Sequence, residues 1–265
     1  MIGAVQAARR GAASLWTPTS LFTGGVQGWW YDPADFSTLF QDAAGTTPVT
    51  GTGQPVGRVL DKSGNANHLT TPGTGFRPTI EVAGGYYYLR FDGADDRLVS
   101  SAAVNMSTTD EISVCITASF RNLPAVQMAV ELGSNSLAYG GFFIVTEAAN
   151  AIFAPRGDRI AVLGDNTPAA VAIDTVYVLN GKSKINAGTK AQIRKNATLA
   201  GESTSTTFGG GNFSSTLFLN IGSRSGGLLP GFINLYQSIG VGSLLSSQNT
   251  ALLETYSGSK AGLSI

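Results

Sequence analysis

Three aspartates in one short segment form the densest group of chemically active side chains in the sequence. Asp92, Asp95 and Asp96 lie within five consecutive positions. Carboxylate oxygens are the hard ligands that calcium takes in proteins. The group would gain further oxygen donors if a second turn met it in space, namely Asp61, Asn65 and Asn67.

The same aspartates have a simpler use. Short acidic side chains in turns accept hydrogen bonds from nearby backbone amides. Arg90 and Arg97 flank the segment and would neutralise part of its charge without a metal. We therefore expect no cofactor and no bound metal, with calcium at Asp92, Asp95 and Asp96 as the alternative.

Acidic pairs that could hydrolyse a polysaccharide are not apparent. Glycoside hydrolysis needs two carboxylates about 5 to 10 Å apart across the scissile bond. Same-face neighbours on a strand are two residues apart, so a cleft enzyme built on strands would place acids at alternate positions. The glutamates are instead widely separated, at Glu81, Glu111, Glu131, Glu147, Glu202 and Glu254. We expect no catalytic residues and no enzymatic activity.

Two residue types that often carry chemistry occur once each. His68 is the only histidine, and without a partner visible in the sequence we expect it to pack within its turn. Cys115 is the only cysteine, which excludes an intrachain disulfide. It lies in an alternating apolar segment, whereas a reactive thiolate needs electropositive, partly exposed surroundings. We predict a buried, unreactive thiol.

Two aromatic triplets, at residues 29–31 and 86–88, could stack on sugar rings. Consecutive residues of a strand point to opposite faces, so part of each triplet must face the core. Core or interface packing is the favoured interpretation, and the sequence identifies no ligand-binding residues. Residues 209–211 lack the Gly-Lys-Ser/Thr that completes a phosphate-binding loop.

The bulk composition argues against nucleic-acid and membrane partners. The 265 residues carry a net charge of zero, with 13% charged residues, so no basic face is expected. No run approaches the roughly 18 apolar residues of a membrane-spanning helix. No apolar stretch of signal-peptide length follows Arg9 and Arg10, so a cleaved secretion signal is not expected.

Alternation of polar and apolar residues predicts many half-buried strands. In the clearest case, residues 111–120, one face carries Ile112, Val114, Ile116, Ala118 and Phe120. Further strands are predicted at 86–91, 126–132, 142–146, 160–163, 175–179, 191–194, 216–221 and 232–241. Glycine-rich turns separate them at 84–85, 140–141, 164–166 and 209–212.

Two local signals are more specific. Asn180-Gly181 predicts a two-residue hairpin turn of type I′. A single helix is predicted near the end of the chain, capped by Ser246 or Ser247 and ended by Gly258. Its apolar side would consist of Ala251, Leu252, Thr255 and Tyr256.

Together these elements predict an antiparallel β-sandwich over residues 27–265. Residues 1–26 differ in composition and read as an N-terminal arm that contains Arg9, Arg10 and Trp16. Two interpretations of the arm stand side by side: a frayed terminus, or a docking peptide that holds the domain on a larger assembly.

The order of five short motifs resembles that of laminin-G-like, concanavalin-A-like jelly-roll domains. The motifs are DKSGNANH (61–68), FDGADDRL (91–98), NIGSR (220–224), GFINLY (231–236) and the segment 245–256. The resemblance covers roughly residues 28–258 and implies a jelly-roll sandwich.

A second, narrower resemblance concerns the start of the domain. The segment WYDPADFSTLFQD (30–42), with GTTPV (45–49) and GQPVG (53–57), is similar to the front end of a group carried by tailed bacteriophages. The resemblance implies a virion protein (a tail fibre, a spike or a head or tail decoration), assembled in the host bacterial cytoplasm. The implied partners are other virion proteins, further copies of the chain and host-surface glycans. Alternatives are a stand-alone carbohydrate-binding module and, third, a polysaccharide hydrolase or lyase.

Overall fold

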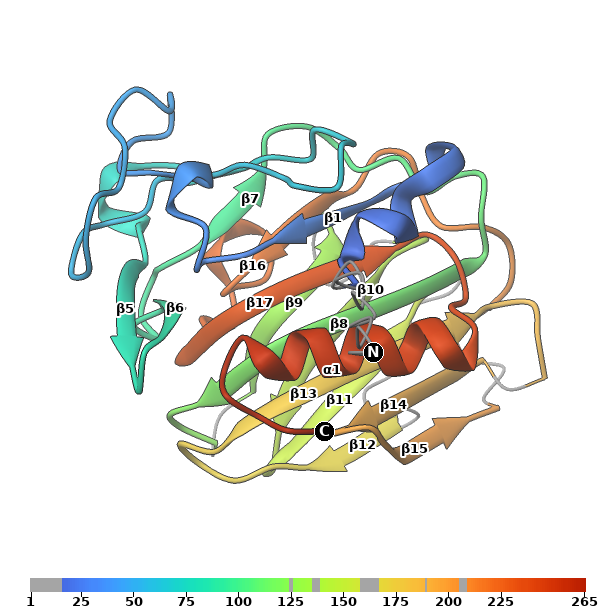
Figure 1. Cartoon of the computed structure of the whole chain (residues 1–265). Helices are drawn as coiled ribbons and strands as arrows, with labels where there is room; N and C mark the ends of the chain where they lie inside the picture. Colours follow the sequence, from blue (N-terminus) through green and yellow to red (C-terminus); the bar gives the residue numbers. More distant parts are fainter. Residues whose placement is uncertain (1–15, 124–125, 135–138, 158–166, 189, 205–208) are drawn as a thin grey trace, which may run out of the picture.

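The computed structural model is a two-layer antiparallel β-sandwich with one C-terminal helix, which confirms the predicted fold class (Figure 1). It describes residues 16–123, 126–134, 139–157, 167–188, 190–204 and 209–265. The strand predicted at 160–163 and the turn predicted at 164–166 lie outside these residues. All pairs of named strands are antiparallel.

Sheet A has eight strands and carries the helix. Its spatial order is β15 (Thr198–Ser203), β14 (Ala191–Lys195), β13 (Val176–Lys184), β8 (Glu111–Phe120), β17 (Ile233–Val241), β6 (Tyr86–Arg90) and β5 (Thr79–Ala83), and β1 (Gly28–Tyr31) pairs with β17.

Sheet B has nine strands and forms the second layer. Its spatial order is β12 (Thr167–Ala170), β11 (Asn150–Pro155), β10 (Phe142–Glu147), β9 (Gln127–Gly133), β16 (Phe218–Ile221), β7 (Leu98–Ser100), β4 (Leu69–Thr70), β3 (Arg58–Val59) and β2 (Leu39–Phe40). Short 3-10 turns lie at Pro18–Gly25, Phe36–Thr38, Thr74–Phe76 and Ser225–Gly227.

The main hydrophobic core lies between the two sheets. Large aromatic rings bridge the layers: Trp29 of β1 stacks on Phe142 of β10, with ring centroids 5.8 Å apart, and Phe142 also contacts Phe153 of β11. The Trp29 indole donates a 3.0 Å hydrogen bond to Ser238 Oγ, which satisfies its buried N–H. Burial of such rings is the main contribution to sandwich stability.

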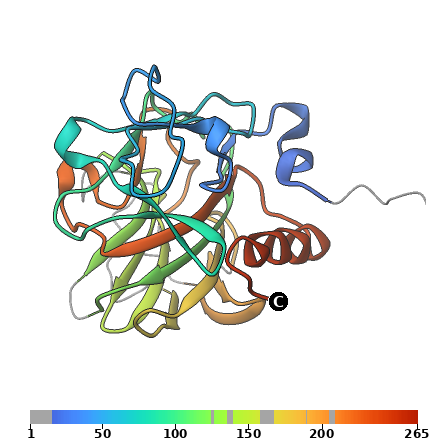
Figure 2. The ribbon, with the colours of Figure 1, turned by 60° about the vertical axis from the view of Figure 1, so that its left-hand side comes forward.

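Helix α1 (Ser247–Ser259) lies against the outer face of sheet A (Figure 2). The predicted cap at Ser246 is confirmed, because its side chain accepts a hydrogen bond from Asn249 N at 3.2 Å. The predicted buried side is wrong. The side that faces the sheet consists of Thr250, Leu253, Glu254, Ser257 and Gly258, and the helix runs through Gly258 rather than ending there.

The helix also changes the environment of strand β8, which is buried on both faces rather than half-buried. Its predicted polar face lies under α1. Thr117 Oγ1 donates to the Ser257 carbonyl at 2.9 Å, and Cys115 Sγ lies 3.4 Å from Ser257 Oγ. Polar residues on this face therefore serve helix docking, which period-two alternation cannot distinguish from solvent exposure.

The hairpin predicted at Asn180-Gly181 is wrong, because both residues lie inside the unbroken strand β13 and pair with Cys115 and Val114 of β8. Two-residue turns occur elsewhere. Gly84-Gly85, with φ of 60° and 88°, joins β5 to β6 as predicted. The turn between β14 and β15 uses Asn196-Ala197, with φ of 48° and 64°.

The described part of the predicted arm contacts the same outer face as α1. Leu21 and Phe22 are buried in a second, smaller cluster that includes Trp30 and Leu253. Trp16 packs edge-on against Tyr256 of α1, with ring centroids 6.0 Å apart. Arg9 and Arg10 lie outside the described residues, and the domain boundary at residue 26 stays a prediction. Among described residues, no helix is long and apolar enough to cross a membrane.

Candidate functional site

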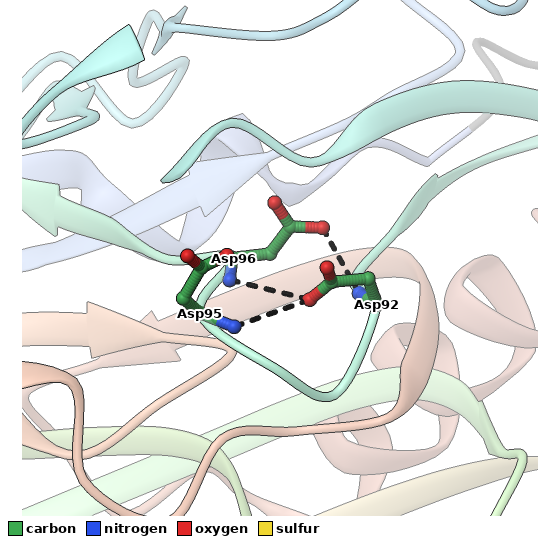
Figure 3. Close-up of side chains that lie close together, drawn as sticks. All are labelled: Asp92, Asp95 and Asp96. Carbon is green, nitrogen blue, oxygen red and sulfur yellow. Dashed lines mark hydrogen bonds between the residues drawn. The ribbon is translucent and has the colours of Figure 1, made fainter. Parts of the chain in front are cut away.

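The three predicted aspartates lie in the turn between β6 and β7 (Figure 3). Asp92 Oδ1 accepts hydrogen bonds from the backbone N–H groups of Ala94 at 2.8 Å, Asp95 at 3.3 Å and Asp96 at 3.4 Å. Asp96 Oδ2 in turn accepts from Asp92 N at 2.9 Å. Two of the three carboxylates thus close the turn through backbone hydrogen bonds, as the favoured interpretation predicts. The expectation of no bound metal stays a prediction, with calcium as its alternative.

Crowding perturbs the ionisation of this turn. Oxygen atoms of Asp92, Asp95 and Asp96 lie within 4.8 Å of one another. Burial, followed by the charge of Asp92, raises the pKa of Asp96 to about 7. Burial alone would raise the pKa of Asp92, but the backbone hydrogen bonds that it accepts outweigh burial and lower it. The pKa values of the Asp92 and Asp96 carboxyls therefore shift in opposite directions.

A cavity of about 380 Å³ adjoins the turn. Three regions at one end of the sandwich line it: the acidic turn, the residues Asn122 and Val126 between β8 and β9, and the segment that precedes β17. We call it the Asp92 pocket; it is lined by Asp92, Gly93, Asn122, Val126, Gln127, Leu229, Pro230 and Phe232.

A buried glutamine joins two of these loops. Gln127 is 3% exposed; its Oε1 accepts from Phe232 N at 2.7 Å, and its Nε2 donates to the Asn122 carbonyl. Met128 N donates to the Leu229 carbonyl at 3.0 Å. Because one side chain satisfies backbone groups of both loops, the pocket walls are held in place before any ligand arrives.

Arg121, which directly follows β8, connects the acidic turn to the same pocket walls. Its guanidinium lies 3.6 Å from the centre of the Phe232 ring, and its Nη2 donates to the Phe91 carbonyl. A glycine is needed at position 93, because the Cβ atom of any other residue would lie 2.8 Å from Phe232 Cβ and clash with it. Leu229 has φ of 49°, a left-handed backbone that costs a non-glycine residue free energy and is concentrated at functional sites.

The chemistry of the lining suits a sugar. Asn122 is exposed at the rim, and its amide can both donate to and accept from hydroxyl groups. The Asp92 carboxylate adds a further acceptor. Val126, Leu229 and Pro230 offer apolar surface to the C–H groups of a ring. A few polar groups among apolar lining residues are typical of small-ligand pockets.

The second predicted turn does not join the first. Asp61 Oδ1 accepts from Trp30 N at 2.9 Å, and Asn67 Nδ2 donates to the Gly28 carbonyl at 2.8 Å. Among described residues, the clustered acids are Asp92, Asp95 and Asp96 without Asp61. This turn instead anchors β1. His68 packs within it as predicted, its Nδ1 accepting from Asp61 N at 3.0 Å.

The predicted aromatic residues are largely committed to packing. Trp29, Trp30 and Tyr31 are all buried, so this triplet offers no sugar platform. Tyr87 packs on Phe36, and Tyr88 packs on Tyr236. Tyr86 is the most open of the second triplet, at 38% exposed.

Comparisons with known proteins identify the fold. No family model matches the chain, and no curated protein matches it. The receptor-binding domain of botulinum neurotoxin D superposes with a TM-score of 0.53 and 8% identity, over 75% of this chain and 50% of that chain. A sialidase of Trypanosoma rangeli, in complex with the inhibitor DANA, has a TM-score of 0.55 and 11% identity, over 92% and 34%.

A third solved structure is that of botulinum neurotoxin type C, whose cell entry is described as dependent on two ganglioside molecules. Its TM-score is 0.51 at 10% identity, over 75% of this chain and 48% of that chain. This chain therefore spans half or less of the length of these three solved structures. At such identities the likeness shows a shared jelly-roll β-sandwich and nothing further.

Proposed function

We propose that this chain is a structural protein of a bacteriophage virion, in a tail fibre, a spike or a head or tail decoration. Its lectin-like sandwich would attach to host-surface glycans through the Asp92 pocket. The virion role is supported by the front-end motifs at residues 30–57. Its partners would be other virion proteins and further copies of the chain, assembled in the host bacterial cytoplasm. We assign it no catalytic step.

The Asp92 pocket is the observation that carries the adhesive role. It combines an exposed amide at Asn122 with a carboxylate at Asp92 and apolar side chains, in a cavity of about 380 Å³. The hydrogen bonds of Gln127 hold its walls. This use is consistent with botulinum neurotoxin type C, a protein of similar fold whose cell entry depends on interaction with two ganglioside molecules.

Binding of the full-length protein to a glycan array tests the adhesive role. We expect a defined set of glycans to bind, and Asn122→Ala to weaken their binding about fivefold, because each lost hydrogen bond contributes about 1 kcal/mol. Gln248→Ala, an exposed amide on α1, is the matched control and should bind normally. Silence of the wild-type protein across the array would contradict the adhesive role.

The virion role has a separate test. Purified particles from the source should contain the chain, and a full-length variant with Arg9→Ala and Arg10→Ala should be incorporated less. Particles that lack the protein would remove the virion role. Glycan binding without any particle association would favour the alternative, a stand-alone carbohydrate-binding module, because the pocket belongs to the sandwich alone.

A further inference from the structure

We propose that the Asp92 pocket selects glycans by charge: it takes a neutral sugar and repels one that carries a carboxylate or sulfate, and Asp95 sets this preference. The inference rests on the proposed glycan-binding function and adds the class of its ligand. Its basis is the distribution of charge around the pocket.

The negative charge beside the pocket has no contacting cation. Among the ion pairs within 4.0 Å that join described residues, none involves Asp92, Asp95 or Asp96. Arg121 lies beside the lining, but its guanidinium contacts the Phe91 carbonyl and the Phe232 ring and forms no ion pair with a carboxylate of the turn. An acidic ligand in the pocket would therefore meet carboxylates without a matching contact from a guanidinium or ammonium group.

Asp95 differs from its two neighbours in what its carboxylate does. Asp92 Oδ1 and Asp96 Oδ2 accept backbone hydrogen bonds that close the turn. The Asp95 carboxylate takes part in no hydrogen bond between described residues, and the residue is exposed. Its charge is therefore free to act on a ligand, and it can be removed without breaking the turn.

The distances make the effect measurable. The three carboxylates lie within 4.8 Å of one another, and Asp92 itself lines the pocket. Like charges several ångströms apart near a protein surface repel enough to weaken binding by about five- to tenfold. Salt screens exposed charges over about 10 Å at 0.1 M, so the discrimination should diminish at high ionic strength.

The test uses the full-length protein and a panel of neutral glycans, each paired with its sialylated or sulfated counterpart. EDTA is present, so that no divalent cation bridges two carboxylates. We expect the neutral member of each bound pair to bind about five- to tenfold tighter. Asp95→Asn should raise binding of the acidic member and leave the neutral member unchanged. Glu202→Gln, which removes an exposed carboxylate on β15 at the far edge of sheet A, is the matched control.

The outcomes separate the two proposals. Equal or tighter binding of acidic glycans in EDTA overturns the charge selection while leaving glycan binding intact. An unchanged ratio in Asp95→Asn, in a variant whose unfolding midpoint matches that of the wild type, overturns the role of Asp95. Absence of binding to every glycan overturns the proposed adhesive function, and the charge selection with it.

Discussion

Asn180 of strand β13 donates a 3.0 Å hydrogen bond from Nδ2 to Oε1 of Glu254 in helix α1, across the boundary between sheet A and the helix. Glu254 is only 1% exposed and also accepts from Arg194 Nε at 2.7 Å. Lys182 Nζ donates to the Leu245 carbonyl at 2.8 Å, just before the helix begins. The helix is thus held on the sheet by buried polar contacts together with the apolar cluster that contains Leu253.

Removing the carboxylate at the centre of this network should be costly. Glu254→Ala leaves Asn180 and Arg194 without their shared acceptor, and breaking a buried charge pair costs about 3 kcal/mol. We expect a loss of that size in the free energy of unfolding, measured by urea denaturation. Glu202→Ala, an exposed glutamate, should change it little. Equal stability of the two variants would contradict the structural role of Glu254.

The thiol of Cys115 should be protected in the folded protein. Burial raises its pKa to about 12, and α1 covers it through Ser257. At about pH 8 we expect negligible reaction with a thiol reagent in native conditions and complete reaction in urea, because only the thiolate is nucleophilic. Rapid stoichiometric labelling of the native protein would show that the helix does not cover this strand.

Gly181 should tolerate no side chain. A Cβ atom at this position would lie 2.4 Å from Phe153 Cδ2 of the opposite sheet, so Gly181→Ala forces the sheets apart locally. Overpacking of this kind costs about 1–3 kcal/mol, measurable as a lower thermal midpoint. The matched control is Gly188→Ala, where no atom lies within 4 Å of the new Cβ; it should unfold like the wild type.

Stability should fall with rising pH because of Asp96. Its folded-state pKa is about 7, against about 3.9 in an unfolded chain. The folded state therefore holds the extra proton between these values, and stability present below about pH 4 is lost as the pH rises towards 7. Each pKa unit between the folded and the unfolded state corresponds to about 1.4 kcal/mol in the free energy of unfolding.

Asp96→Asn isolates this contribution. The amide oxygen of the introduced asparagine can still accept from Asp92 N, while the titrating charge is gone. We expect the variant to be more stable than the wild type at about pH 8 and to lose less stability between about pH 5 and pH 8, as measured by urea denaturation. A variant with the same pH slope as the wild type would assign the dependence to another group.

Calcium should leave the protein unchanged. Asp92 and Asp96 already accept backbone hydrogen bonds within the turn, which reduces their capacity as ligands. We expect the thermal midpoint at neutral pH to be the same in EDTA and in added calcium. A rise in calcium that Asp95→Asn abolishes would instead assign a metal to the turn.

Local signals predicted those elements whose conformation depends on neighbours in the chain. Gly84-Gly85 forms a hairpin turn because glycine adopts positive φ without steric cost, and Ser246 caps α1 because its hydroxyl reaches a free backbone amide. Asn180-Gly181 carries an equally strong turn signal but lies inside β13. There the small residue is required by Phe153 across the core, a contact that no local pattern contains.

The Asp92 pocket illustrates the same division at the candidate site. The acidic turn was visible in the sequence as three neighbouring aspartates. Asn122 and Leu229 were not identified, because they are remote in sequence and neither belongs to a motif. They meet the turn only where strands β6 and β8 end and strand β17 begins, at the same end of the sandwich, and Gln127 bonds both segments.

The sequence by itself determined the antiparallel sandwich, the Gly84-Gly85 turn and the helix near residue 247, because alternation, glycine φ preferences and helix capping act over a few residues. Only the tertiary structure decided which polar residues are buried, which side of α1 faces the sheet, and where a pocket opens. Those outcomes depend on which surfaces meet, and Asn180 and Glu254 meet although 74 residues separate them in the chain.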